Sequence, residues 1–215
     1  MKKMVIFHTT VKTVDPLSAL AAKYLPDYTV NNILDDSILP ELLESPKNMQ
    51  QVYERISILL SAVKSADFIL LACSSIGGYK DFSPKINSIP VLRIDEQMIV
   101  KAIDNGGSIA VLATLKTTLQ PTMDFCLTVL RQMKKEDISF ESYLLDKAYD
   151  CGKKGDMSGH DSIIKTCIAE IEDKFQSIIL AQASMAQAVK NHPALGKKIL
   201  TSPELCFQNL QNQYG

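Results

Sequence analysis

The most constraining feature of this sequence is an apolar run without polar interruption, Phe68–Ala72, which Cys73, Ser74 and Ser75 follow directly. A run of this length and character predicts a strand buried on both faces, as in parallel sheets covered by helices. Ligands of open α/β sheets bind outside the carboxyl ends of the strands. Cys73 is therefore a candidate reactive group, although a free cysteine can also serve only as a small buried apolar side chain.

Strand and helix patterns alternate along the chain. Asp15 followed by Pro16 predicts a helix start, residues 48–65 have the apolar spacing of an amphipathic helix, and Asp95 predicts the cap of a helix that ends at Asn105-Gly106-Gly107. Strands are expected at Met4–Phe7, Tyr28–Leu34, Phe68–Ala72, Ile89–Ile94 and Ser108–Ala113. This order predicts an α/β fold with a mostly parallel sheet flanked by helices.

Two pairs of similar segments indicate an internal duplication. Thr10-Val11-Lys12-Thr13 resembles Thr114-Leu115-Lys116-Thr117, at an offset of 114 − 10 = 104 residues, and Phe68–Ser75 resembles Ser177–Ser184, at 182 − 73 = 109. Two matches in the same order at nearly the same offset predict two similar α/β lobes. We expect one lobe over residues 1–105 and the second over residues 106–201.

If the lobes are similar, their strand-end loops are expected to face one another across a cleft. Hydroxyls, together with backbone N–H groups at helix starts, suit a small carboxylate. Any one of these hydroxyls can instead be a helix cap. The expected cleft residues are Thr9, Thr10, Cys73, Ser74, Ser75, Thr114, Thr117, Thr118, Gln182 and Ser184.

Composition excludes several classes of function. Lys and Arg number 23 against 24 Asp and Glu, so the net charge of −1 favours neither nucleic acid nor a membrane surface as a partner. The apolar run behind Lys2-Lys3 stops at His8, which is too short for a signal peptide, and no later run has the length of a membrane span. The odd number of cysteines, without paired zinc spacing, favours a reducing cytoplasm and predicts no metal site. They are Cys73, Cys126, Cys151, Cys167 and Cys206.

The sequence resembles the aspartate/glutamate/hydantoin racemase superfamily over essentially its whole length. The similarity lies in the strand ending at Cys73-Ser74-Ser75 and in four further segments: Pro90–Met98, Ile109–Pro121, Ile178–Met185 and Thr201-Ser202-Pro203. The resemblance implies two pseudo-symmetric flavodoxin-like lobes with the active site between them. It also implies a C-terminal helix, residues 202–215, that packs on the first lobe, and a chain that can form a homodimer.

The chemistry implied by this resemblance is cofactor-independent proton transfer at the carbon next to a carboxylate, on a small amino acid or related acid. In the family's racemases one thiolate removes the α-proton and a second thiol protonates the opposite face. Carried onto this chain, Cys73 is the first cysteine. Ser74, Ser75, Thr114, Thr117 and Thr118 would hold the substrate carboxylate.

The chain departs from the family pattern at the second cysteine, where Gln182 stands. A carboxamide is neither acid nor base at neutral pH, so two-thiol racemisation is in question. His160, followed by Asp161 and expected just before a helix over 160–174, is the favoured replacement. Three readings remain open: a racemase or isomerase, a one-thiol decarboxylase or lyase, and a carboxylate-binding protein without catalysis. Arg93, Lys12 and Lys116 are candidates for binding a second carboxylate.

Overall fold

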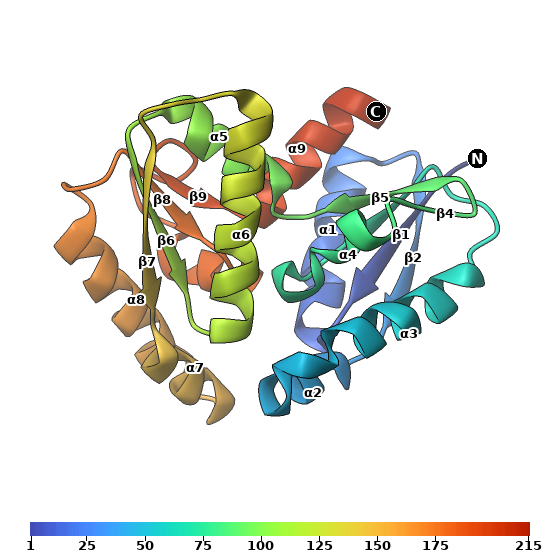
Figure 1. Ribbon diagram of the computed structural model, residues 1–215, viewed down its shortest axis with the longest axis horizontal. Coiled ribbons are helices and arrows are strands. Elements are labelled where there is room, and N and C mark those ends of the chain that lie inside the picture. Colours follow the sequence, from blue (N-terminus) through green and yellow to red (C-terminus); the bar gives the residue numbers. More distant parts are fainter. The chain divides into compact units, whose positions relative to one another are not determined.

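The computed structural model describes residues 1–215, which form two compact units (Figure 1). Unit 1 comprises Met1–Ile94 together with Cys206–Gly215, and unit 2 comprises Asp95–Leu205. Each unit is a mainly parallel sheet with helices on both faces, so the α/β fold with two flavodoxin-like lobes is confirmed.

Unit 1 contains a five-stranded sheet in the order β2-β1-β3-β5-β4, in which only the short edge strand β4 is antiparallel. The strands are β1 (Lys2–His8), β2 (Tyr28–Leu34), β3 (Phe68–Leu71), β4 (Lys85–Ile86) and β5 (Ile89–Arg93). The helices are α1 (Val14–Tyr24), α2 (Ile38–Glu44), α3 (Met49–Ser61) and α4 (Tyr79–Phe82), with 3₁₀ helices at Val11–Thr13, Pro46–Asn48 and Ser74–Ile76.

Unit 2 contains a four-stranded parallel sheet in the order β7-β6-β8-β9. The strands are β6 (Ser108–Ala113), β7 (Ser139–Leu144), β8 (Ser177–Leu180) and β9 (Ile199–Thr201). The helices are α5 (Glu96–Asn105), α6 (Lys116–Met133), α7 (Asp146–Lys153) and α8 (Met157–Ile171), with a 3₁₀ helix at Ala183–Val189. The last helix, α9 (Ser202–Tyr214), begins in unit 2 and continues into unit 1.

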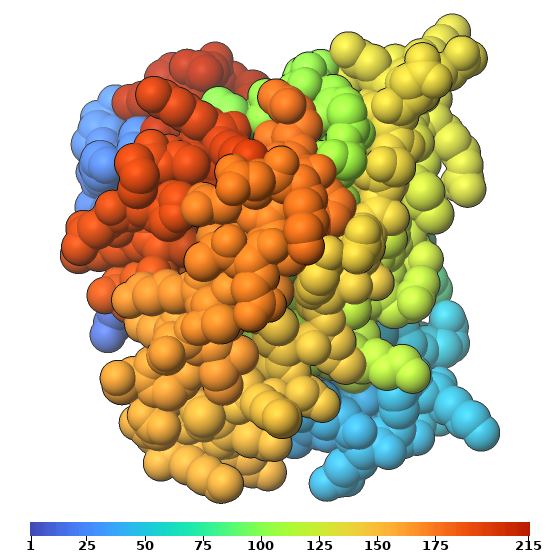
Figure 2. Space-filling model, turned by 90° about the vertical axis from the view of Figure 1, so that its left-hand side faces the viewer, coloured from blue at the N-terminus to red at the C-terminus, as the bar shows by residue number.

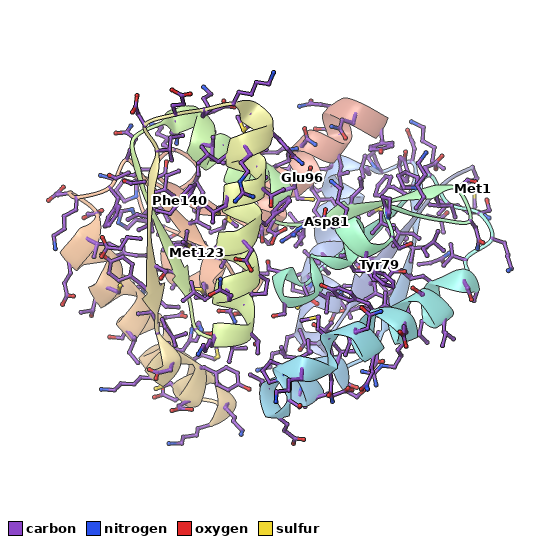
Figure 3. All side chains as sticks on the ribbon, in the orientation of Figure 1. Met1, Tyr79, Asp81, Glu96, Met123 and Phe140 are labelled. Carbon is purple, nitrogen blue, oxygen red and sulfur yellow. The ribbon has the colours of Figure 1, made fainter.

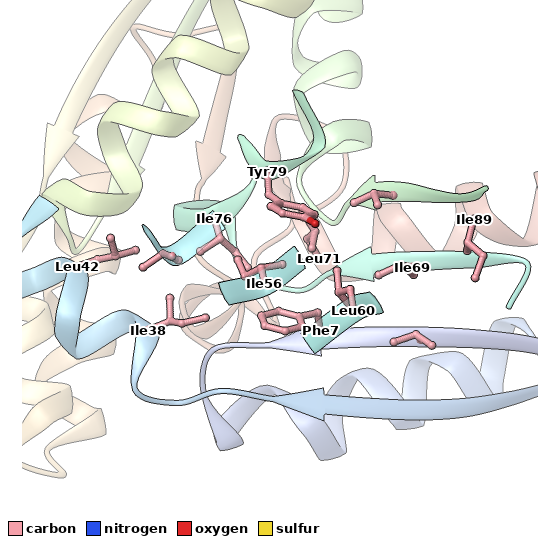
Figure 4. Packing of buried hydrophobic residues seen from close by; sticks show 13 residues of the cluster. Phe7, Ile38, Leu42, Ile56, Leu60, Ile69, Leu71, Ile76, Tyr79 and Ile89 are labelled. Atoms are coloured by element: carbon pink, nitrogen blue, oxygen red, sulfur yellow. The ribbon is translucent and has the colours of Figure 1, made fainter. Parts of the chain in front are cut away.

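The two faces of the unit 1 sheet bury alternate residues of each strand, as the period of two requires. Phe7, Ile69 and Leu71 pack with α2 and α3, where Tyr79 closes the cluster (Figure 4). The Tyr79 hydroxyl hydrogen-bonds the Ser57 hydroxyl at 2.9 Å, so its polar end is satisfied inside the layer. The opposite face packs with α1 and with Phe207 and Leu210 of α9.

The unit 2 sheet is covered in the same way. One face packs with α5 and α6, where the partly buried Met123 and Phe140 complete the layer (Figure 3). The other face packs with α8 and with the 3₁₀ helix Ala183–Val189, which lie side by side in the orange part of Figure 2. Both units therefore consist of three layers.

The sheet register sharpens the internal repeat. Met4 pairs with Phe68 in unit 1, as Ile109 pairs with Ser177 in unit 2, so the offsets are 109 − 4 = 105 and 177 − 68 = 109. The first offset differs by one from the 104 expected from similar letters. Thr114 therefore corresponds to Thr9 rather than to Thr10, while Gln182 corresponds to Cys73 as expected. The sequence comparison matches residues of similar type, whereas backbone hydrogen bonds between strands determine which residues occupy equivalent positions in the two sheets.

The division between the units falls after Ile94, not after residue 105 as expected. The reason is the packing of α5, whose buried residues Met98, Ile99 and Ala102 contact strands of unit 2. The glycine turn at Gly106-Gly107, with positive φ values of 76° and 70°, only ends that helix.

Two expected helix starts also differ. Helix α1 begins at Val14, so Asp15 lies in its first turn and does not cap it. Helix α8 begins at Met157 because Asp156 Oδ1 accepts a hydrogen bond from Gly159 N at 2.8 Å.

No helix of the chain has both the length and the apolar character that crossing a bilayer requires.

Candidate functional site

The strand order gives each unit one topological switch point, where ligands of doubly wound sheets bind. In unit 1 it lies between β1 and β3, which lead to Thr9 and Cys73, and in unit 2 between β6 and β8, which lead to Thr114 and Gln182. Four of the residues expected from the sequence thus lie at the two edges where a ligand is expected.

Cys73 is partly exposed and has an extended backbone, with φ −139° and ψ 121°. It precedes a 3₁₀ helix of three residues, Ser74–Ile76, in which both serines are buried. Cys73 is thus followed by a single short 3₁₀ helix and not by the N-terminus of a long helix, which is one of the surroundings that favour a thiolate. Cys73 packs against the apolar layer that contains Leu71 and Ile69 and is only partly buried.

Thr9 and Thr10, which follow β1, have different surroundings. The Thr9 side chain is only 2% exposed, and its hydroxyl oxygen is buried without a hydrogen-bond partner. Thr10 instead caps the 3₁₀ helix Val11–Thr13 by accepting from Lys12 N at 3.4 Å. An unsatisfied buried hydroxyl costs about 1–3 kcal/mol. Thr9 is therefore the better candidate for contacting a ligand, and Thr10 has the structural role of a cap.

His8, the last residue of β1, is completely buried. Its Nδ1 lies 2.8 Å from Thr13 Oγ1 and its Nε2 lies 2.9 Å from Asn32 Oδ1. Burial lowers the pKa of His8 below its usual 6.5, and the hydrogen bond to Asn32 opposes this shift in part. His8 therefore fixes the chain that leads to Thr9 and favours the neutral ring.

The lowered pKa of His8 predicts that acid weakens folding. Above pH 6.5 the ring is neutral in both the folded and the unfolded state. Below pH 6.5 the unfolded chain binds a proton more readily than the folded chain, so the free energy of unfolding decreases as the pH is lowered. One such group contributes a slope of at most about 1.4 kcal/mol per pH unit. Urea unfolding between pH 8 and pH 5 should give a flatter dependence for His8→Gln than for the wild type. Parallel curves for the two proteins would contradict the prediction.

The glycine pair after the serines makes room for two polar side chains. A Cβ at Gly77 would lie 2.5 Å from Cζ of Arg93, and one at Gly78 would lie 2.5 Å from the hydroxyl oxygen of Tyr53. Neither glycine has a positive φ, so space and not backbone conformation requires them. The Arg93 side chain, only 4% exposed, therefore packs directly against the loop that carries Cys73.

In unit 2 the Gln182 side chain, which follows β8, is hydrogen-bonded to Thr114, which follows the neighbouring strand β6. Its Oε1 accepts from Thr114 N at 2.5 Å and from Thr114 Oγ1 at 2.9 Å. Thr114 is buried and Gln182 is partly exposed. The two residues that correspond to Thr9 and Cys73 are thus joined into one rigid corner at the carboxyl end of the sheet.

The remaining expected residues of unit 2 divide into two groups. Thr118 is buried, and the Thr117 hydroxyl oxygen is buried without a partner, in the first turn of α6, where the apolar Leu115 stands at the N-cap. Both lie at the N-terminus of this helix, where an anion is favoured. Ser184, by contrast, is exposed within the 3₁₀ helix Ala183–Val189.

His160 lies inside the first turn of α8, not before the helix as expected, and its side chain is buried. Its Nδ1 is 2.8 Å from Asp161 Oδ1. The ring also packs against Gly152 of α7, 3.5 Å from the place of a Cβ there. The carboxylate that follows His160 in the sequence therefore contacts its ring, and the same ring packs against α7.

The match to a family model covers residues 4–208, and the model is described as Asp/Glu/Hydantoin racemase. The chain belongs to this family. No curated protein matches the sequence significantly.

Solved structures of racemases share the fold of this Asp/Glu/hydantoin racemase family member. Aspartate racemase from Picrophilus torridus is 19% identical with a TM-score of 0.72, over 99% of this chain and 94% of that one. Glutamate racemase from Aquifex pyrophilus is 18% identical with a TM-score of 0.66, over 99% and 84%. Allantoin racemase from Pseudomonas fluorescens is 16% identical with a TM-score of 0.67, over 99% and 90%.

Membership of the racemase family leaves the individual site residues as predictions. Thr9 and Cys73 each lie two residues beyond the last pair of the β1–β3 ladder, at the same edge of the sheet, and hydrogen bonds join Thr114 to Gln182. That one substrate contacts residues of both units stays a prediction. Lys12 and Lys116 are exposed, and no group of three or more His, Cys, Asp or Glu side chains could hold a metal ion. The sequence did not predict that Arg93 packs against Gly77. The only available signal was an arginine at the end of an apolar strand.

Proposed function

We propose that this chain is a cofactor-independent enzyme of the racemase or isomerase type, acting next to the carboxylate of a small amino acid or related acid. Membership of the racemase family supports this reaction class. The observation that carries the proposal is a partly exposed thiol, Cys73, at the switch point of unit 1, beside the unpartnered hydroxyl of Thr9. All five cysteines are free, which suits a reducing cytoplasm.

In the proposed step the Cys73 thiolate takes the proton from the α-carbon. The C–H bond breaks, an S–H bond forms, and the electron pair moves into the carboxylate to give an enediolate. The thiolate, not the thiol, is the effective base and nucleophile. Protonation of that carbon on the opposite face inverts the centre, whereas return of a proton to the same face gives only exchange with solvent. Neither outcome needs a redox or group-transfer partner.

Charge on the carboxylate oxygens must be stabilised for this step to proceed. The proposed donors are the hydroxyls of Thr9, Ser74 and Ser75 in unit 1, and those of Thr117 and Thr118 at the start of α6. The positive end of the 18-residue helix α6 favours an anion there. His160 with Asp161 is the proposed second proton donor or acceptor.

A second candidate function rests on Gln182. Because its carboxamide stands where the family's second thiol is expected, the chain can instead be a one-thiol decarboxylase or lyase, or a carboxylate-binding protein without catalysis. These alternatives share the carboxylate-binding edges and differ in whether, and where, a proton moves.

Exchange of the α-hydrogen for deuterium, followed by proton NMR in D₂O, tests the proposal. The panel contains both enantiomers of aspartate, glutamate and alanine, with malate and lactate as hydroxy acids. We expect exchange for at least one acid, with chiral chromatography reporting inversion. An acid that binds measurably but never exchanges would identify a binding protein and contradict the proposed enzyme.

A further inference from the structure

The orientation of the Gln182 carboxamide follows from its partner. A backbone N–H can only donate, so the side-chain atom that faces Thr114 N at 2.5 Å must be the amide oxygen. The Thr114 hydroxyl donates to the same oxygen at 2.9 Å. With both bonds on the oxygen, the amide nitrogen projects from the other side of the group.

The nitrogen of this carboxamide is the available end. Gln182 is partly exposed, its nitrogen is not among the buried polar atoms without partners, and its only hydrogen bonds are those that Thr114 makes to its oxygen. An amide NH₂ has two donor hydrogens and no useful acidity at neutral pH. The corner therefore offers N–H groups in a fixed direction and cannot supply or remove a proton.

The corresponding corner of unit 1 is built differently. There Thr9, the register equivalent of Thr114, has no partner for its hydroxyl, and the thiol of Cys73 stands in place of the carboxamide. The same backbone frame thus carries a titratable group in one unit and a permanent, pre-oriented donor in the other.

We infer that Gln182 binds an oxygen of the substrate, on a carboxylate or on the oxyanion that develops from it, as a donor held in place by Thr114. The inference rests on the proposed function and narrows it: Gln182 stabilises charge and moves no proton itself, so the second proton transfer is left to another group, for which His160 is the proposed candidate. The ligand class is a small carboxylate. Thr114 is a positioning residue, because it acts only through the amide oxygen of Gln182. A fixed donor aimed at a charged oxygen changes binding by about ten-fold or more.

The substitution Gln182→Glu isolates this role. A glutamate oxygen can accept the same two Thr114 hydrogen bonds and has nearly the same volume, so the anchor and the fold are retained. The outer end of the side chain changes from a donor to a charged acceptor, which repels a carboxylate. Gln187→Glu is the matched control, because Gln187 is exposed in the 3₁₀ helix that directly follows Gln182 and the substitution adds the same charge.

The measurement is nitrogen-15 NMR titration of the full chain with malonate, L-glutamate and D-glutamate at millimolar concentrations. The side-chain NH₂ signal missing from Gln182→Glu identifies Gln182. We expect at least one acid to shift this signal, Gln182→Glu to weaken its binding about ten-fold or more, and Gln187→Glu to leave affinity within about two-fold. The unfolding midpoint of Gln182→Glu should stay close to that of the wild type.

Each alternative result has a defined meaning. An unmoved Gln182 signal with all three acids, or equal affinity of Gln182→Glu and the wild type, overturns the inference. Deuterium exchange that proceeds equally well in Gln182→Glu overturns it while leaving the proposed enzyme intact. A shifted Gln182 signal without exchange of any acid supports the inference and contradicts the proposed enzyme.

Discussion

Replacing Cys73 by serine is expected to lower the rate of α-deuterium exchange by about a thousand-fold, on whichever acid the wild type exchanges. General-base catalysis contributes about a hundred- to ten-thousand-fold, and a serine hydroxyl has a pKa far too high to replace a thiolate. The side chain lies at the switch point of unit 1 and is only partly buried, so the substitution removes the base without removing a buried core group.

Stability and binding separate this effect from damage to the fold. Cys73→Ser changes one partly exposed atom, so its unfolding midpoint should lie close to that of the wild type, and acids that bind the wild type should still bind. Cys151→Ser is the matched control, because Cys151 is another partly exposed free cysteine, on α7. Exchange by Cys73→Ser within a few-fold of the wild type would remove Cys73 from the proposed reaction.

Segments with strong local patterns were predictable from the sequence. Tyr28–Leu34 and Ser108–Ala113 form strands with the expected bounds, and the helix expected over residues 48–65 is α3, Met49–Ser61. Strand β9 was missed, since three residues carry no periodicity and its place depends on pairing with β8. Short strands are determined mainly by the neighbours they pair with.

The candidate site was predictable in residue type and less so in role. Cys73 and Gln182 correspond by register, as the similar segments indicated, and both follow the third strand of their sheets. The hydrogen bonds from Thr114 to Gln182 could not be predicted from the sequence. The similar sequence segments paired Thr114 with Thr10, whereas the strand register pairs it with Thr9. A shift of one residue along a strand moves a side chain to the other face, and only the ladder of backbone hydrogen bonds excludes it.

Arg93 shows how far a role can change between sequence and structure. As a cation at a strand end it was a candidate for binding a second carboxylate. Its guanidinium instead packs against Gly77, and its charge lowers the pKa of Tyr53 against the raising effect of burial. Tyr53 in turn contacts Gly78. The two glycines, the arginine and the tyrosine therefore determine how closely the loop after Cys73 approaches the sheet.

Gly77→Ala is accordingly expected to destabilise unit 1 by about 1–3 kcal/mol, a large effect for the addition of one methyl group. The new Cβ would lie 2.5 Å from Cζ and Nη2 of Arg93 and 2.7 Å from Nε. Atoms at these distances overlap, so either a buried guanidinium or the loop that carries Ser74 and Ser75 must move. Because Arg93 is only 4% exposed, its displacement disturbs a charge within the packed layer. Urea denaturation of the variant and the wild type measures the loss.

Two further variants assign the loss to this contact. Gly152→Ala in α7 should be neutral or stabilising by up to about 1 kcal/mol, because its nearest neighbour would be 3.5 Å away and alanine favours a helix. Combining Gly77→Ala with Arg93→Met, which removes the branched end of the side chain, should cost less than the sum of the single changes if the two residues compete for one space. Strict additivity of the two free-energy changes would place the strain elsewhere, and an unchanged unfolding free energy of Gly77→Ala would show that the guanidinium can move freely.

Loss of α-deuterium exchange in a folded Gly77→Ala variant would indicate that the same close packing also positions Cys73, because the glycine itself contributes no reactive group.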